Sequence, residues 1–229
     1  MILEELKKLL IKEGASDAGI SNIQEYLPPE LKMFKTCITV VVKLSDAIVN
    51  EIADSPTFTY YHHYKAVNNL IDLLTLKGVL FLESKGYFAM SIAASQSVHG
   101  KDSGFSGVLS HKIGAVLSGM GFIGKNNLFV HSRFGPRVRL GTILTTYEPE
   151  EKIENHIIQP QCGECNLCVI SCPAQALRGS TWHFGIDRNE MIDPHACSTY
   201  MKEKFKYIGR GQVCGICMRV CPYGSEVKR

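Results

Sequence analysis

Nine cysteines occur in the 229 residues, and eight of them lie in the C-terminal third of the chain. The first four, Cys162, Cys165, Cys168 and Cys172, have the spacing C-x2-C-x2-C-x3-C-P. In this motif three neighbouring thiolates bind one 4Fe–4S cluster, and the fourth is carried toward a second cluster. The spacing therefore predicts iron–sulfur chemistry, and it requires a partner motif.

The partner motif lies near the C-terminus, where three cysteines repeat the C-x2-C-x3-C-P spacing and a fourth precedes them. Ligation is expected to be crossed, as in two-cluster ferredoxins. The first cluster then takes three cysteines of the first motif and the last of the second: Cys162, Cys165, Cys168 and Cys221. The second cluster takes the remaining four: Cys197, Cys214, Cys217 and Cys172.

Zinc and disulfide bonds are the other uses of clustered cysteines. Four-cysteine zinc sites also use tetrahedral thiolates, but they usually pair C-x2-C knuckles across a long gap and need no third cysteine followed by Cys-Pro. Disulfides are disfavoured because cytosolic thiols stay reduced. The ninth cysteine, Cys37, lies in the apolar run 36–42 and is expected to be a small core residue.

The cysteines also divide the chain by composition. Residues 1–155 form a cysteine-poor body and residues 156–229 carry eight cysteines, so two domains are expected. The composition, 45% hydrophobic and 21% charged, is that of an ordinary globular protein. The N-terminus lacks the pattern of a signal peptide, and no apolar run approaches the roughly 20 residues of a membrane helix. A cytoplasmic protein without a membrane partner is expected.

The N-terminal body is expected to be mixed α/β, with strands separated by helices. Apolar residues at helical spacing predict helices over 2–10, 60–84 and 110–119. Short apolar and β-branched runs predict the strands, which are 36–42, 87–94, 127–131 and 137–145.

The run from Gly119 to Asn126 matches two phosphate-binding patterns, G-x-G-x-x-G and G-x4-G-K. A phosphate-binding loop leaves a strand and opens a helix, whereas here the predicted helix precedes the glycines and a strand follows. Asn126 also replaces the hydroxyl residue that would bind magnesium. We therefore expect no nucleotide loop; the glycines instead allow the backbone to approach a flat or bulky ligand closely.

Two further groups of residues can be interpreted either as ordinary solvent-exposed surface or as part of a binding site. The start of the long helix, 60–68, is rich in Tyr and His, which could cap the surface or line a pocket. Four basic residues lie near the second cysteine motif: Lys202, Lys204, Lys206 and Arg210. They form either a solvated face, or a docking surface for an acidic electron donor or a phosphate-bearing substrate.

Several of these segments together resemble epoxyqueuosine reductase and its short relatives. The segments are 119–128, 134–140 and 144–145, the double cysteine motif, 94–96 and 110–112. The resemblance implies an α/β cobalamin-binding-type domain followed by an α+β ferredoxin-like domain with two 4Fe–4S clusters. It also implies kinship with the reductive dehalogenases and a cobalamin bound with its base displaced.

The resemblance further implies how the site is made up. Gly124, Lys125, Asn126 and Arg139 are the candidates for holding the cobalamin. Lys125, Asn126 and Arg139 could equally be exposed residues of a strand edge or a turn. The family's acidic residue aligns with Asp102 only across a three-residue gap. His111 is the other candidate for the proton donor, since the unperturbed pKa of histidine lies near neutrality.

The function expected from the resemblance is a cobalamin-dependent reductase. Electrons would pass from a donor such as ferredoxin or flavodoxin through both clusters to cobalt, and from Co(I) to a small-molecule substrate. Family members continue into helical repeats that grip tRNA, whereas this chain ends at Arg229, which weakens the expectation of a tRNA substrate. A two-cluster electron-transfer protein and a corrinoid-reducing or corrinoid-delivering partner remain alternatives.

Overall fold

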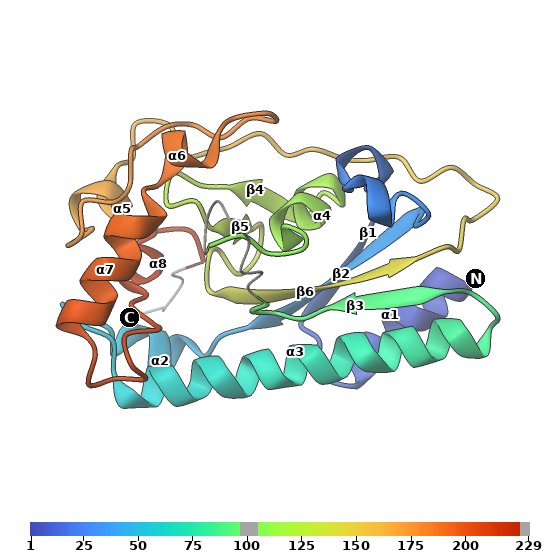
Figure 1. Ribbon diagram of the computed structural model, residues 1–229, viewed down its shortest axis with the longest axis horizontal. Helices are drawn as coiled ribbons and strands as arrows, with labels where there is room; N and C mark the ends of the chain where they lie inside the picture. The colour runs from blue at the N-terminus through green and yellow to red at the C-terminus, as the bar shows by residue number, and fades with distance from the viewer. Residues whose placement is uncertain (97–104, 225–229) are drawn as a thin grey trace. The chain divides into compact units, whose positions relative to one another are not determined.

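The computed structural model describes residues 1–96 and 105–224 (Figure 1). The chain forms two compact units, each assembled from three separate segments. Unit 1 comprises 1–43, 66–120 and 139–158, and unit 2 comprises 44–65, 121–138 and 159–229. The expected division at residue 155 was contiguous, and these units are not. Segments 44–65 and 121–138 contain no cysteine, so composition could not assign them to the cysteine-rich unit.

Unit 1 is built on a four-stranded sheet with the strand order β1-β2-β6-β3. The strands are β1 (Asp17–Asn22), β2 (Thr36–Lys43), β3 (Ala89–Ile92) and β6 (Val138–Thr145). Antiparallel pairing joins β1 to β2 and β3 to β6. The first seven residues of β2 are buried, which accounts for its nearly continuous apolar sequence. Cys37 is fully buried in this strand, as expected of a core residue.

Helices cover both faces of this sheet (Figure 1). They are α1 (Ile2–Lys12), the part of α3 (Phe58–Ser84) from residue 66 onward, and α4 (His111–Leu117). Gly78 of α3 lies so close to β6 that an added Cβ would be 2.3 Å from Ile143. His111 of α4 instead bonds to Thr142. Because neighbouring residues of a strand point to opposite faces, α3 and α4 pack on opposite sides of β6.

Unit 1 also has two short 3-10 helices, η1 (Gln24–Tyr26) and η2 (Pro29–Leu31). Unit 2 contains the antiparallel hairpin of β4 (Gly121–Ile123) and β5 (Phe129–His131). The first turns of α3 belong to unit 2 as well. Its other helices are α2 (Asp46–Asn50), α5 (Leu167–Ile170), α6 (Arg188–Met191), α7 (Pro194–Lys204) and α8 (Ile216–Arg219).

The predicted helices and strands are all present, most with boundaries shifted by one to three residues, and two strands were missed. Strand β1 begins with aspartate and ends with asparagine, residue types that are depleted in strands. Strand β4 lies inside the glycine run. A Cβ on Gly121 would be 2.1 Å from the Val130 carbonyl oxygen of β5. This glycine therefore serves close strand pairing, and the run does not open a helix.

In residues 1–96 and 105–224, no helix combines the length and the apolar character needed to cross a membrane.

Candidate functional site

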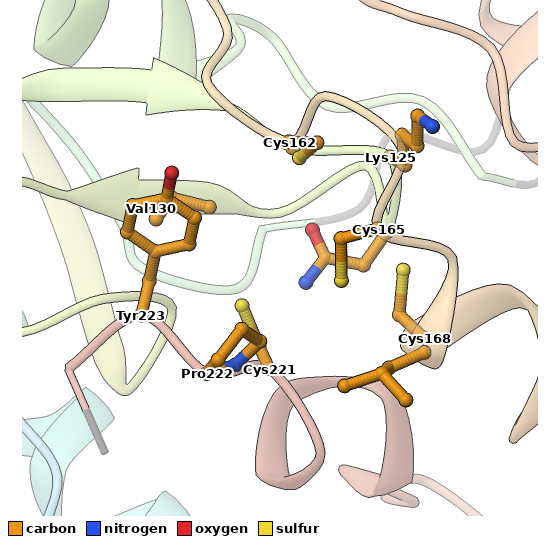
Figure 2. Close-up of a pocket in the computed structure, with 11 residues that line it drawn as sticks. Lys125, Val130, Cys162, Cys165, Cys168, Cys221, Pro222 and Tyr223 are labelled. Carbon is orange, nitrogen blue, oxygen red and sulfur yellow. The ribbon is translucent and has the colours of Figure 1, made fainter.

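Four motif cysteines line one cavity of unit 2, here called the first cavity (Figure 2). Its empty volume is about 330 Å³. Figure 2 shows the four cysteines placed around a common space, with Lys125, Val130 and Tyr223 also in the wall. The cysteines come from both motifs: Cys162, Cys165, Cys168 and Cys221.

Local turns position these thiols. The amide of Cys165 donates to the carbonyl oxygen of Cys162 at 2.9 Å, which closes a tight turn between the two cysteines. Gly163 in this turn has φ 49°, a left-handed conformation that favours glycine. Helix α5 begins directly after Asn166 and carries Cys168, which is buried. The C-x2-C-x2-C spacing thus presents three sulfurs from one turn and one short helix.

Two thiols of the first cavity, those of Cys168 and Cys221, resist ionisation. Burial raises the pKa of Cys168, and the neighbouring Cys162 and Cys165 raise it further. Burial and the same neighbours raise the pKa of Cys221 to about 11. Four adjacent thiolates repel one another, so they become stable together only when a positively charged group binds between them.

The other four motif cysteines line the second cavity of unit 2, whose empty volume is about 600 Å³: Cys172, Cys197, Cys214 and Cys217. Burial raises the pKa of Cys197 to about 11, with further contributions from Cys214 and Cys172. The pKa of Cys217 is raised in the same way. The amide of Ala176 donates to the sulfur of Cys172 at 3.4 Å, a bond that stabilises a thiolate.

The two cavities divide the cysteines in the crossed pattern that the spacing predicts. Cys172 of the first motif lines the second cavity, and Cys221 of the second motif lines the first. The cavities also adjoin each other, because helix α5, which carries Cys168, packs against helix α8, which carries Cys217. Asn126 joins them, since it lines the first cavity and its Nδ2 donates to the Cys217 carbonyl oxygen at 3.4 Å.

The arrangement of the thiols fits a cluster better than a single ion. A four-cysteine zinc site needs its sulfurs about 2.3 Å from one point. Within residues 1–96 and 105–224, no three potential ligands are arranged to hold a single metal ion. The sulfurs instead line two separate spaces in unit 2, four around each. A group with several metal atoms would fill such a space and reach all four thiols.

Lys125 lines the first cavity and directs its ammonium group toward the turn that follows Cys162. The residue is 9% exposed, and its Nζ donates to the carbonyl oxygen of Gly163 at 2.8 Å and to Oδ1 of Asn166 at 3.0 Å. Both acceptors are neutral. No carboxylate forms an ion pair with Lys125 in the part of the chain that the structure describes. The two bonds hold the turn from Cys162 to Asn166 in place, and they put the positive charge of Lys125 next to the segment that carries three of the thiols.

Gly124 and Asn126, two of the expected cobalamin contacts, also line the first cavity. A Cβ on Gly124 would be 3.6 Å from the sulfur of Cys162. Asn126 is 3% exposed, and its Oδ1 accepts from the amide of Leu128 at 3.1 Å. The structure therefore gives these two residues and Lys125 contacts with the thiol cavity, and their contact with a corrin stays a prediction.

Arg139, the fourth expected cobalamin contact, belongs to unit 1. Its Nε donates to Oδ1 of Asn68 at 2.8 Å, and its Nη2 donates to the carbonyl oxygen of Ala94 at 3.3 Å. These bonds tie β6 to α3 and to the segment after β3. A role in corrin binding also stays a prediction for this residue.

Of the two candidate proton donors, the structure describes only His111. Asp102 lies outside the described residues. His111 has both ring nitrogens engaged, with Nε2 3.0 Å from the Ala93 carbonyl oxygen and Nδ1 2.8 Å from Oγ1 of Thr142. A carbonyl only accepts, so Nε2 carries the proton and Nδ1 accepts from the hydroxyl.

Burial, together with a smaller effect of the charge of Arg139, lowers the pKa of His111 to about 4, against the opposing effect of the bond to Ala93. The ring is therefore neutral near pH 7. The geometry fits a structural link between α4 and β6, and proton donation by His111 stays a prediction.

The sequence did not single out several side chains that stabilise the site. Asn166, which accepts from Lys125, gave no signal because it is a spacer within the first motif. The Tyr223 hydroxyl donates to the Gln161 carbonyl oxygen at 2.7 Å and so joins the two motifs. Arg137 is 2% exposed and its Nη1 lies 3.0 Å from Oδ1 of Asp46, 91 residues away in sequence. The only sequence signal for Asn166 and Tyr223 is that each lies within or directly beside a cysteine motif.

Comparison with protein families supports the iron–sulfur interpretation. The family model described as a 4Fe-4S double cluster binding domain matches residues 161–224. This range contains all eight motif cysteines. The match confirms the 4Fe–4S-binding character predicted for the cysteine-rich segment.

Two groups of curated proteins are similar in sequence. Epoxyqueuosine reductase of Staphylococcus aureus is 30% identical over 128 residues, which cover 51% of this chain and 30% of that protein. Tetrachloroethene reductive dehalogenase of Desulfitobacterium hafniense is 31% identical over 114 residues, which cover 49% of this chain and 18% of that protein. These matches therefore span about a third or less of the length of the curated relatives.

Solved structures of the same two kinds share the fold. A catabolic reductive dehalogenase in complex with 3-bromo-4-hydroxybenzoic acid matches with a TM-score of 0.74 at 17% identity, over 97% of this chain and 32% of that chain. A selenomethionine-labelled epoxyqueuosine reductase matches with a TM-score of 0.62 at 18% identity, over 98% of this chain and 66% of that chain. The resemblance to epoxyqueuosine reductases and reductive dehalogenases that the sequence predicted is confirmed.

Proposed function

We propose that the protein is an iron–sulfur oxidoreductase in which two 4Fe–4S clusters relay single electrons. The observation that carries this proposal is the grouping of eight cysteines into two adjacent four-thiol cavities. The match of residues 161–224 to a double cluster binding domain supports it. The similarity to two kinds of reductase supports the wider assignment as an oxidoreductase.

In this proposal each cavity holds one cluster. Cys162, Cys165, Cys168 and Cys221 ligate the first cluster, and Cys172, Cys197, Cys214 and Cys217 ligate the second. Each thiol would lose its proton to ligate iron, and the bonds to iron would offset the cost of ionisation that the raised pKa values of Cys168, Cys197 and Cys221 express. A bound 4Fe–4S cluster supplies reversible one-electron transfer.

The chain's own residues would tune this transfer. Lys125 places its charge beside the first cluster and fixes the Gly163 turn, while Asn126 joins the walls of the two cavities. Both residues are nearly buried, which limits the access of water to the first cluster. Burial and hydrogen bonds near the sulfurs are the features by which a protein sets cluster potentials.

We further propose a corrinoid cofactor and a small-molecule substrate, with a ferredoxin or flavodoxin as the electron donor. The support for this part is the similarity to reductive dehalogenases and epoxyqueuosine reductases. The geometry of unit 1 gives no additional support for a corrinoid, because Arg139 and His111 already form hydrogen bonds with neighbouring protein atoms. A two-cluster electron-transfer protein is the second candidate, since the thiol cavities alone suffice for that function.

The test of the clusters is anaerobic reconstitution followed by iron, sulfide and zinc analysis and electron paramagnetic resonance (EPR). About eight iron atoms per chain are expected. Cys172→Ser should remove the signal of the second cluster, whereas Cys37→Ser, a change in the core of unit 1, should leave the iron content unchanged. The proposal would be contradicted if the reconstituted protein contained zinc in place of iron. It would also be contradicted if Cys172→Ser and Cys37→Ser lost equal amounts of iron.

The corrinoid part has a separate test. Reconstituted protein is mixed with cobalamin under reducing conditions and passed over a gel-filtration column, and the visible spectrum of the protein peak is recorded. Retention of about one corrin per chain supports the reductase. Intact clusters without corrin would favour the electron-transfer protein.

A further inference from the structure

Helix α7 connects the second cavity to the protein surface. Cys197, Tyr200 and Met201 on this helix line the cavity. The next residue, Lys202, is exposed in the last turn, and Lys206 and Arg210 are exposed just beyond the helix. Between 202 and 210 the chain carries four basic side chains and one acidic side chain. A surface of positive charge therefore begins one residue from the wall of the second cavity.

Aromatic side chains lie within this charged segment. Tyr207 is 62% exposed and Phe58 is 59% exposed, and their rings meet edge to face with centroids 6.3 Å apart. Gly209 packs against the ring of Tyr61, because an added Cβ there would be 2.2 Å from a ring carbon. The start of α3 and the segment after α7 therefore form one continuous surface of unit 2.

We call this surface the basic–aromatic surface, and its residues are Phe58, Lys65, Lys202, Lys206, Tyr207 and Arg210. Lys65 belongs to it because its Nζ lies 5.5 Å from the centroid of the Tyr61 ring. An exposed aromatic pair with basic residues around it has the composition of a protein interface, in which aromatics and arginine are enriched. The charge makes an acidic partner the complement.

We propose that the basic–aromatic surface docks a small acidic protein that carries one electron, such as a two-iron ferredoxin. This inference rests on the proposed function, since it requires a cluster in the second cavity. In the transfer, one electron leaves the reduced iron of the carrier and enters the second cluster, whose charge falls by one; no bond forms and no proton moves. Opposite charges speed the encounter by steering the partner toward the surface.

RNA is the other partner that basic and aromatic residues can bind. Stacking on a base needs an open ring face. Gly209 packs against the Tyr61 ring, so that ring is not open on this side. The position of Lys202 next to Met201, which lines the thiol cavity, further favours an electron carrier.

The test measures how fast a reduced two-iron ferredoxin bleaches the clusters of reconstituted protein in stopped flow, at several salt concentrations. Lys206→Glu combined with Arg210→Glu should lower the second-order rate constant by about tenfold at low ionic strength and flatten its salt dependence. The matched control is Lys8→Glu combined with Lys152→Glu, which makes the same charge change at exposed sites of unit 1 and should leave the rate within about twofold of wild type.

A second pair of variants tests the aromatic part. Tyr207→Ser should slow reduction by the carrier, and Tyr26→Ser, at a 40% exposed tyrosine of unit 1, should not. All variants should be reduced by dithionite at the wild-type rate, since dithionite is a small molecule that needs no docking surface.

Three outcomes would overturn the inference. Equal rates with the carrier for wild type and the Lys206/Arg210 variant would show that the electron enters elsewhere. Binding of a labelled RNA stem-loop that the same variant loses, with carrier kinetics unchanged, would assign the surface to RNA. Clusters that are absent, or that dithionite cannot reduce, would refute the proposed function itself and the docking surface with it.

Discussion

Replacing Lys125 with methionine removes a buried positive charge from the first cavity and keeps most of the side chain's volume. The lysine is 9% exposed, and its Nζ lies 2.8 Å from the carbonyl oxygen of Gly163, the residue directly after Cys162. A 4Fe–4S cluster carries one more negative charge when reduced than when oxidised. The ammonium therefore stabilises the reduced form more, and its removal should lower the reduction potential of the first cluster.

The size of the effect follows from Coulomb's law. For a unit charge on the order of 8 Å from the cluster centre, at an effective dielectric constant of about 20, the interaction is about 2 kcal/mol. For a one-electron couple this energy corresponds to about 90 mV. Little of this is lost to solvent screening, because Lys125 is nearly buried.

The assay is a potentiometric titration of the anaerobic protein, followed by the EPR signal of the reduced first cluster. Lys125→Met should lower its midpoint potential by roughly 50–100 mV. Asn166→Ala is the matched control, because it removes one acceptor of the ammonium and keeps the charge; its shift should be less than half as large. A shift below about 20 mV in Lys125→Met, with the iron content unchanged, would refute the electrostatic reasoning.

Three further variants test individual contacts by urea unfolding. Asp46→Ala should destabilise the protein by about 3 kcal/mol, because it leaves the 2% exposed Arg137 as an unpaired buried charge, and a loss below about 1 kcal/mol would argue against this pair. Gly135→Ala should lower the urea midpoint of unfolding and release iron, since Gly135 has φ 58° and an added Cβ would be 1.9 Å from the Tyr223 carbonyl oxygen. A variant with the iron content of wild type would contradict this packing. The pKa of His111 is lowered to about 4 by burial, so the unfolded state binds a proton before the folded state does, and stability should fall as the pH drops below about 6.5. Between pH 7 and pH 5 wild type should lose about 2 kcal/mol more than His111→Gln, and equal losses would show that His111 is not the group responsible.

Much of the α/β body could be predicted from local patterns. Strand β2 is buried along most of its length, so its residues form an apolar run that needs no long-range information to recognise. The part of α3 from residue 66 onward shows the helical spacing of buried residues such as Val67, Ile71 and Leu74. Strand β4 gave no such signal, because Gly121 is selected by its close contact with Val130 of β5.

The sequence by itself determined the number and grouping of the thiols. A spacing of two residues lets one turn present neighbouring sulfurs, and the three-residue step to Cys-Pro carries the fourth away, so local geometry separates Cys172 from Cys168. The tertiary structure decided what surrounds them. Lys125 is 38 residues from Gly163 in sequence and contacts it only because unit 2 brings separate segments together. Local spacing encodes the ligands, whereas the charge, burial and hydrogen bonds that set a cluster's potential come from side chains distant in sequence, which no periodicity reveals.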